Sequence, residues 1–125
     1  MPKQDRPWIW QLALAGYWLA LLVGTHVPRE FPALPREGAD KWVHVVAFAV
    51  LGWLVAETWQ RSAGRLNAAH LRAAWLVIAL YAAADELTQP FVGRYASATD
   101  GLADVAGAAL GLALFAYWRG PRKKR

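Results

Sequence analysis

Residues 7–28 read PWIWQLALAGYWLALLVGTHVP, a stretch of 22 residues without Asp, Glu, Lys or Arg. An α-helix rises about 1.5 Å per residue, so roughly 20 apolar residues cross the ~30 Å hydrocarbon layer of a membrane. The stretch is too long for the apolar part of a cleaved signal peptide, and no small-residue cleavage motif follows it closely. We therefore expect it to be retained as a membrane-spanning helix.

Three shorter uncharged segments follow, at residues 42–56, 73–84 and 105–118. Such segments can still span a membrane when the bordering charges lie near the interface or face the interior of a helix bundle. The sequence therefore predicts an all-α, polytopic membrane protein whose residues 1–125 form a single domain. We expect four transmembrane helices, at about 8–27, 40–59, 71–90 and 100–118.

The composition agrees with a membrane protein. Apolar residues make up 57% of the 125 residues and charged residues only 18%, against about 25% charged residues in soluble domains. The alternative, a water-soluble four-helix bundle, needs helices with a polar face, and segments such as LALAGYWLALLVG have none. Because the chain contains no Cys, a disulfide scaffold, a Cys-ligated zinc site and a thiol nucleophile are excluded.

Lys and Arg are unevenly divided between the two ends of the predicted bundle. Four helices place both termini and the middle loop on one side, which holds 10 of the 14 basic residues, including those of the tail 119–125. The positive-inside rule places this side, with both termini, in the cytoplasm. We interpret the basic tail as an anchor beside anionic lipids and expect no nucleic-acid partner.

Acidic residues collect at the opposite, outer end, which holds Glu30, Glu37, Asp40, Asp85, Glu86, Asp100 and Asp104. Glu86 lies 15 residues after Leu71, where the third helix is expected to begin, and this is roughly 22 Å of rise. A carboxylate at that depth is costly unless it is paired, protonated or facing a wet cavity. At the inner end, Glu57 is expected to pair with Arg61 four residues later.

Helical spacing predicts which outer groups share a face. Asp40 and His44 are four residues apart, and Gln89 lies three residues after Glu86 and is expected on its face. Asp85 lies about 100° around the helix from Glu86, so the two carboxyls cannot face one spot.

The fourth helix shows the same spacing in Asp100 and Asp104. Gly107 and Gly111 continue this stripe as GAALG, a small-xxx-small pattern that lets helices pack closely. We therefore expect Asp104 to face protein rather than lipid.

The segments DKWVHVVAFAVLGWL, from residue 40, and ADELTQPFVGRYASATDGLADVAGAALG, from residue 84, resemble the VanZ-like family of small bacterial membrane proteins. The family patterns D-K-x-x-H-x-x-x-F, E-x-x-Q and R-x-x-S-x-x-D-x-x-x-N-x-x-G fall in order within about 40–112. One position departs, because Asp104 stands where the family has Asn. The resemblance implies four helices in the bacterial inner membrane and a cell-envelope role, with low-level teicoplanin resistance for the namesake, but no particular reaction.

These patterns and spacings define the candidate site on the outer face. The candidate catalytic residues are Asp40, His44, Glu86 and Asp100. The candidate substrate-binding residues are Lys41, Gln89, Arg94, Ser97 and Asp104. Lys41 and Arg94 suit a phosphate clamp, whereas Ser97 is either a nucleophile or, with Thr99 as the other candidate, a helix cap.

The negative charge of this cluster can be compensated in three ways, and the sequence leaves them open. The carboxyls can share protons, or a cationic ligand group can bind. A divalent cation can also bind, with ligands from Asp40, His44, Glu86, Asp100 and Asp104. The structural interpretation of the cluster is that its polar groups form interhelical hydrogen bonds that only lock the bundle.

Three classes of function remain open on the sequence alone. The protein could be an enzyme acting on a membrane lipid or lipid-linked envelope precursor. It could be a non-catalytic protein that binds such a lipid or a lipophilic glycopeptide antibiotic. It could also be a structural or assembly factor that forms a homo-oligomer or holds a larger membrane partner. A transporter is disfavoured because four helices leave little room for alternating access and no inverted repeat is visible.

Overall fold

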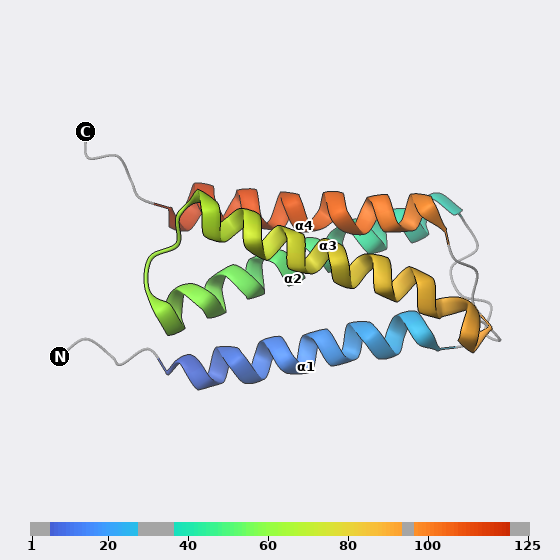
Figure 1. Ribbon diagram of the computed structural model, residues 1–125, viewed down its shortest axis with the longest axis horizontal. Coiled ribbons are helices and arrows are strands. Elements are labelled where there is room, and N and C mark those ends of the chain that lie inside the picture. The colour runs from blue at the N-terminus through green and yellow to red at the C-terminus, as the bar shows by residue number, and fades with distance from the viewer. Residues whose placement is uncertain (1–5, 28–36, 94–96, 121–125) are drawn as a thin grey trace.

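The computed structural model describes residues 6–27, 37–93 and 97–120, with only the backbone helix described for 37–40. These residues form four α-helices, which are α1 (Pro7–His26), α2 (Glu37–Ala63), α3 (Ala68–Thr88) and α4 (Ala98–Arg119). A short 3-10 helix, η1 (Gln89–Val92), follows α3 directly. The helices run alternately in opposite directions (Figure 1), and no strand occurs in the described ranges, so the all-α prediction is confirmed.

Two helices differ from the predicted boundaries. The second helix was expected at about 40–59, but α2 runs for 27 residues, from Glu37 to Ala63. The charged residues Glu57 and Arg61 near the C-terminal end of α2 are compatible with the helix because they pair with each other. The third helix begins earlier than expected, since Asn67 and His70 form a capping box at the start of α3.

The third helix also stops being α-helical before residue 90. Pro90 has no N–H to donate, so the regular hydrogen-bond ladder cannot continue through it. The chain tightens into η1 and leaves the helical path at Gly93, whose φ of 76° suits glycine. This local turn separates the end of α3 from the start of α4.

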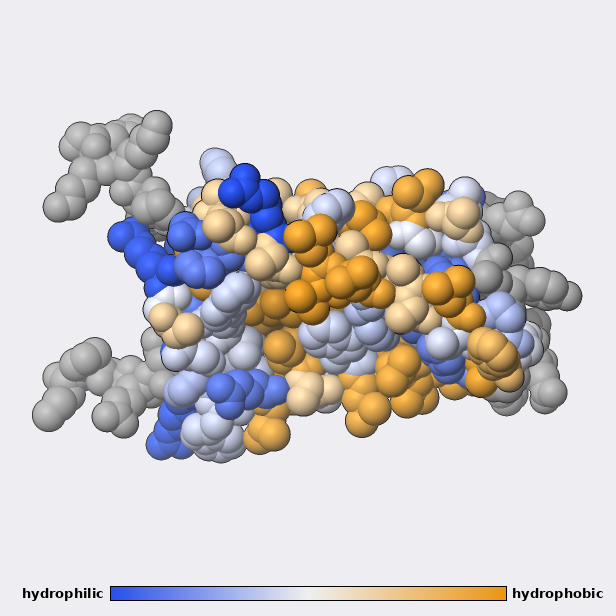
Figure 2. Space-filling view, viewed as in Figure 1, coloured by the Kyte–Doolittle hydropathy of each residue, from blue (hydrophilic) through white to orange (hydrophobic). Residues whose placement is uncertain are grey.

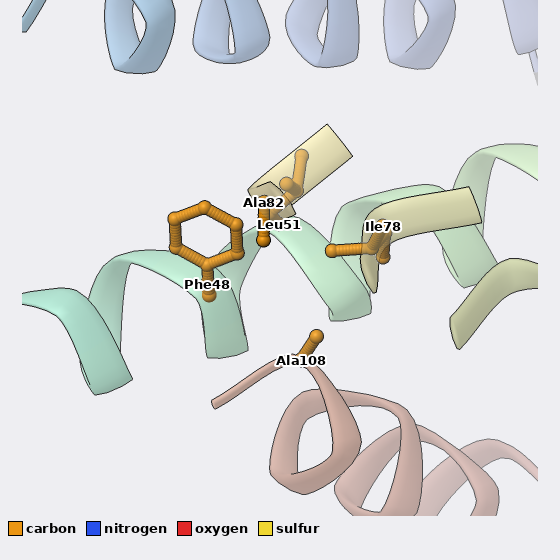
Figure 3. Close-up of a cluster of buried hydrophobic side chains, with 5 residues drawn as sticks. All are labelled: Phe48, Leu51, Ile78, Ala82 and Ala108. Carbon is orange, nitrogen blue, oxygen red and sulfur yellow. The ribbon is translucent and has the colours of Figure 1, made fainter. Parts of the chain in front are cut away.

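The main apolar core lies between α2, α3 and α4. Its fully buried side chains are Phe48, Leu51, Ile78, Ala82 and Ala108 (Figure 3). The α1 helix packs on the outside of this core, where Tyr17 donates a hydrogen bond to the Ala47 carbonyl at 2.6 Å. The core is therefore a three-helix contact with α1 added along one side.

The α2 and α4 backbones approach each other closely because three glycines face the contact. A Cβ atom at Gly107 would overlap the Val45 carbonyl oxygen, and one at Gly111 would overlap the Ala49 carbonyl oxygen. From the other side, a Cβ at Gly52 would lie 2.7 Å from the Ala108 carbonyl oxygen. The predicted small-xxx-small face of residues 107–111 is therefore confirmed as the α2–α4 contact.

Large apolar side chains cover the outside of the bundle. Leu80 is 72% exposed, Leu87 73% and Phe91 87%, whereas soluble proteins rarely expose extended apolar surfaces. Figure 2 shows apolar surface over the middle of the helices and hydrophilic residues toward the end where α1 begins and α4 ends. Among the described helices, three are long and apolar enough to cross a membrane, namely Pro7–His26, Lys41–Ala63 and Ala98–Arg119.

A buried ion-pair cluster holds the end of the bundle where α2 ends and α4 ends. Glu57 is 3% exposed and accepts hydrogen bonds from Arg61 at 2.7 Å and from Arg119 at 2.8 Å. Arg61 also lies over the Trp10 ring, 4.5 Å from its centroid. The predicted Glu57–Arg61 pair is confirmed, and Arg119 and Trp10 extend it to α4 and α1.

Replacing Gly111 by Ala tests the close contact of α2 with α4. We expect the Gly111→Ala variant to lose about 1–3 kcal/mol of stability, because the added methyl group forces the two backbones apart. The matched control is Gly16→Ala in α1, where a Cβ would meet nothing within 4 Å. Thermal unfolding of the purified variants in detergent measures both, and equal midpoints for the two variants would contradict this account of the packing.

Candidate functional site

The opposite end of the bundle contains a buried pair between α2 and α4. His44 Nδ1 lies 2.7 Å from Asp104 Oδ1, and the two residues are 8% and 0% exposed. The close α2–α4 contact brings them together, because Asp104 lies one turn before Gly107 on the packed face of α4. The expectation that Asp104 faces protein is confirmed.

Glu86 approaches the start of α4 from α3. Its Oε2 accepts a hydrogen bond from the Ser97 backbone N–H at 2.9 Å, and its Cγ lies beside Gly101. The N-terminal end of a helix carries partial positive charge, which favours a nearby carboxylate. Asp104, Asp100 and His44 lie near enough to Glu86 to influence it electrostatically, so the four side chains form one cluster of ionisable groups.

Two buried carboxyl oxygens of this cluster have no hydrogen-bond partner among the described residues. Within the described part of the chain, Glu86 Oε1 and Asp104 Oδ2 accept no hydrogen bond. Buried polar atoms are nearly always paired, because an unpaired one loses the hydrogen bonds that water would supply. The cluster therefore has spare capacity to bind a hydrogen-bond donor or a cation.

Ser97 begins α4 as its N-cap. Its Oγ accepts a hydrogen bond from the Asp100 backbone N–H at 3.4 Å and lies 2.8 Å from Thr99 Oγ1. No described contact joins Ser97 to His44, the base that a nucleophilic serine would need. The structure therefore supports the helix cap, one of the two roles predicted for Ser97.

A second polar network joins α1 to the end of α3. Asp85, which is 2% exposed, accepts hydrogen bonds from Thr25 Oγ1 at 2.7 Å and from Gln89 Nε2 at 3.0 Å. Tyr81 OH donates to the same carboxyl group at 3.4 Å. His26 lies at its edge, with Nδ1 3.4 Å from Asp85 Oδ1 and Nε2 2.7 Å from Thr88 Oγ1.

This network corrects one interpretation made from the sequence and adds a residue that was not predicted from it. Gln89 was expected on the face of Glu86, but it lies four residues after Asp85 and hydrogen bonds to that carboxyl instead. Both placements are compatible with helical spacing, and the deeper burial of Asp85 favours a partner there. No role was predicted from the sequence for His26, which connects α1 to α3 through Thr88 and Asp85. The missed signal is that an up-and-down bundle places residues 25–26 level with residues 85–89.

A hollow of about 240 Å³ lies between α1 and α2 beside these two networks. Its walls are mainly apolar and include Ala20, Leu21, Ala47 and Phe48. Its polar lining comes from Thr25 and His44, each of which hydrogen bonds to a buried carboxyl group, Asp85 and Asp104 respectively. Because α1 and α2 are antiparallel, Thr25, late in α1, and His44, early in α2, line the same end of the hollow, and Ala20, Leu21, Ala47 and Phe48 line it further along the two helices.

The remaining candidate residues lie outside the contacts described so far. Lys41 is exposed near the start of α2. The side chain of Asp40 and the whole of Arg94 fall outside the described residues. Among the described His, Asp and Glu side chains, no group of three converges as a metal site. The described members of the predicted metal set therefore do not form one by themselves.

The family assignment follows from a comparison of the whole chain with protein-family models. The model described as VanZ/LLP1 matches residues 8–119. The chain belongs to the VanZ/LLP1 family. The resemblance found over residues 40–112 is therefore confirmed. The match of the VanZ/LLP1 family model extends further, through α1 and to the end of α4. Comparisons with curated proteins and with solved structures gave no significant match.

The Asp85 network should contribute strongly to stability. In an Asp85→Ala variant, the buried Thr25 and Gln89 donors lose their acceptor, and we expect a loss of about 3 kcal/mol. The control is Asp100→Ala, because Asp100 is only partly buried in the first turn of α4 and its removal should cost about 1 kcal/mol or less. Thermal unfolding in detergent measures the difference, and a smaller loss for Asp85→Ala than for Asp100→Ala would refute it.

Proposed function

We propose that this VanZ/LLP1 protein binds the headgroup and one chain of a membrane lipid or lipid-linked envelope precursor at its polar end. The observation that carries the proposal is the hollow between α1 and α2, which has apolar walls and a polar end formed by Thr25 and His44. Hydrocarbon suits the walls, and a polar headgroup suits the end that is connected to buried carboxyl groups. Ligand sites commonly combine these two features.

The proposal includes a topology with four membrane spans. The α3 helix has 21 residues, which corresponds to about 31 Å and is long enough to cross the hydrocarbon layer. Its acidic residues Asp85 and Glu86 are buried inside the bundle rather than facing lipid, as intramembrane carboxyls generally are. With α3 as a span, the basic end is cytoplasmic and the polar site lies on the outer side of the bacterial inner membrane.

The charge of the site indicates the chemistry of the headgroup. The unpaired oxygens of Glu86 and Asp104 favour a headgroup with hydrogen-bond donors, such as an ammonium group or sugar hydroxyls. Lys41 and Arg94 are proposed to contact its phosphate. A lipid that carries both a phosphate and N–H or O–H donors satisfies the two requirements together. The lipophilic glycopeptide teicoplanin, with its acyl chain, would use the same hollow.

The alternative is that the polar networks only lock the helices and that the protein supports a larger membrane partner. The ion pairs of Glu57 and the Asp85 network fit that interpretation, because their hydrogen bonds are internal. The unpaired carboxyl oxygens do not help to lock helices, since they bond to no described neighbour. This difference favours ligand binding over a purely structural role.

The topology can be tested by cysteine labelling, because the chain contains no Cys of its own. Ser62→Cys lies at the end of α2 and Ala98→Cys at the start of α4, and both positions are exposed. We expect a membrane-impermeant maleimide to label Ala98→Cys in intact spheroplasts and Ser62→Cys only after permeabilisation. Labelling of both positions under one condition would mean that α3 does not span, and the reversed pattern would contradict the proposed orientation.

Lipid binding can be tested by native mass spectrometry of the purified protein with phosphatidylethanolamine and phosphatidylcholine of identical chains. We expect phosphatidylethanolamine to bind more tightly, since only its ammonium group donates hydrogen bonds. In a Glu86→Gln, Asp104→Asn variant this preference should fall about tenfold or more, because hydrogen bonds to charged groups contribute about 1.5–3 kcal/mol.

Two controls separate binding from damage to the fold. Ala20→Trp fills the hollow and should abolish the bound lipid, whereas Ala15→Trp changes an exposed position of α1 outside the lining and should not. Glu57→Gln removes a buried carboxylate at the other end and should leave the lipid preference unchanged. Equal binding of both lipids, or unchanged binding in Ala20→Trp, would favour the structural alternative.

A further inference from the structure

The opposite, basic end of the protein is hollowed between α3 and α4. A hollow of about 540 Å³ lies there, lined by residues that include Arg65, Asn67, Leu71 and Ala116. A second hollow of about 250 Å³ lies deeper along the same two helices. The two share Leu71 and Ala116 in their linings, so they form one groove, here called the α3–α4 groove.

The deeper part of the α3–α4 groove suits hydrocarbon. Its walls on α4 are three alanines, Ala109, Ala113 and Ala116, together with Leu112, and its apolar walls on α3 are Leu71 and Trp75. Alanines at intervals of four and three residues lie on one face of a helix, and they leave room beside the larger side chains of α3. A chain in this part of the groove would contact apolar atoms along most of its length.

The mouth of the α3–α4 groove is cationic. Arg65 lines the wide part and Arg72 the deeper part, and both side chains are exposed. No described acidic residue pairs with either arginine, and Glu57, the buried acid at this end, is already bonded to Arg61 and Arg119. Arg72 lies only four residues into α3, about 6 Å from its start, so its guanidinium can extend back to the mouth.

We propose that the α3–α4 groove binds an anionic phospholipid of the adjacent leaflet, with its phosphate on Arg65 and Arg72 and one acyl chain between α3 and α4. Guanidinium groups bind phosphate oxygens in a bidentate manner, and basic pockets between membrane helices bind anionic headgroups. The groove lies at the other end of the molecule from the hollow between α1 and α2, so this inference does not depend on the function proposed for that hollow.

The test is native mass spectrometry and nanodisc titration of the full chain with phosphatidylglycerol and phosphatidylcholine of identical chains. We expect the wild-type protein to retain phosphatidylglycerol selectively. An Arg65→Gln, Arg72→Gln variant should bind it about 30-fold more weakly, which corresponds to about 2 kcal/mol for two cations beside an anionic lipid. Arg6→Gln is the matched control, because Arg6 is an exposed arginine at the same end but precedes α1, away from the groove.

Two further measurements distinguish a lipid in the groove from general attraction to charge. Ala113→Trp fills the apolar part without changing any charge, and it should reduce phosphatidylglycerol binding to a similar extent. Soluble glycerol phosphate should compete poorly, because it has no acyl chain for the groove. Equal loss in Arg6→Gln, unchanged binding in Ala113→Trp, or effective competition by glycerol phosphate would each overturn the proposal. An Arg65→Lys, Arg72→Lys variant keeps both positive charges and should retain part of the binding. This result would show that the double Gln variant loses binding through loss of charge and not through loss of the fold.

Discussion

The close approach of α2 to α4 is the contact on which the rest of the structure depends. Gly52, Gly107 and Gly111 lack the side chains that would hold the two backbones apart, and these helices make the most extensive interhelical contact in the described chain. In a membrane, such close packing provides van der Waals contact where the hydrophobic effect provides little. The same contact sets the register that brings His44 within 2.7 Å of Asp104.

The buried carboxyl groups of the bundle are accommodated in three different ways. Glu57 is neutralised by two arginines, and Asp85 is surrounded by donors from α1 and α3. Glu86 and Asp104 each use one oxygen and leave the other without a partner among the described residues. The first two arrangements complete their own hydrogen bonding and hold helices together. The third is incomplete by itself, and it therefore supports the ligand proposal that the hollow between α1 and α2 carries.

The position of α1 matters for access to the site. It lies outside the three-helix core, and most of its side chains face away from the bundle. Directional contacts hold it at three levels, through Trp10, Tyr17 and Thr25. Between the last two levels α1 lines the hollow against α2 with the small residues Ala20 and Gly24 and with Leu21. A ligand at this place would be reached from the side, through the lipid phase.

The sequence alone was sufficient for the four-helix arrangement, the membrane-protein character, the family and the end at which the candidate site residues collect. These properties follow from the length of apolar segments, from helical spacing and, for the family, from short sequence motifs, all of which are local. Spacing also placed Asp104, Gly107 and Gly111 on the packed face of α4, and it paired Glu57 with Arg61.

Which helix each polar group meets across the bundle was decided only by the tertiary structure. Gln89 bonds to Asp85 rather than lying with Glu86, His26 joins α1 to α3, and Arg119 completes the Glu57 cluster. These pairings, and the hollows beside them, depend on how far each helix is rotated and how closely it approaches its neighbour, and these quantities are set by the packing of all four helices together.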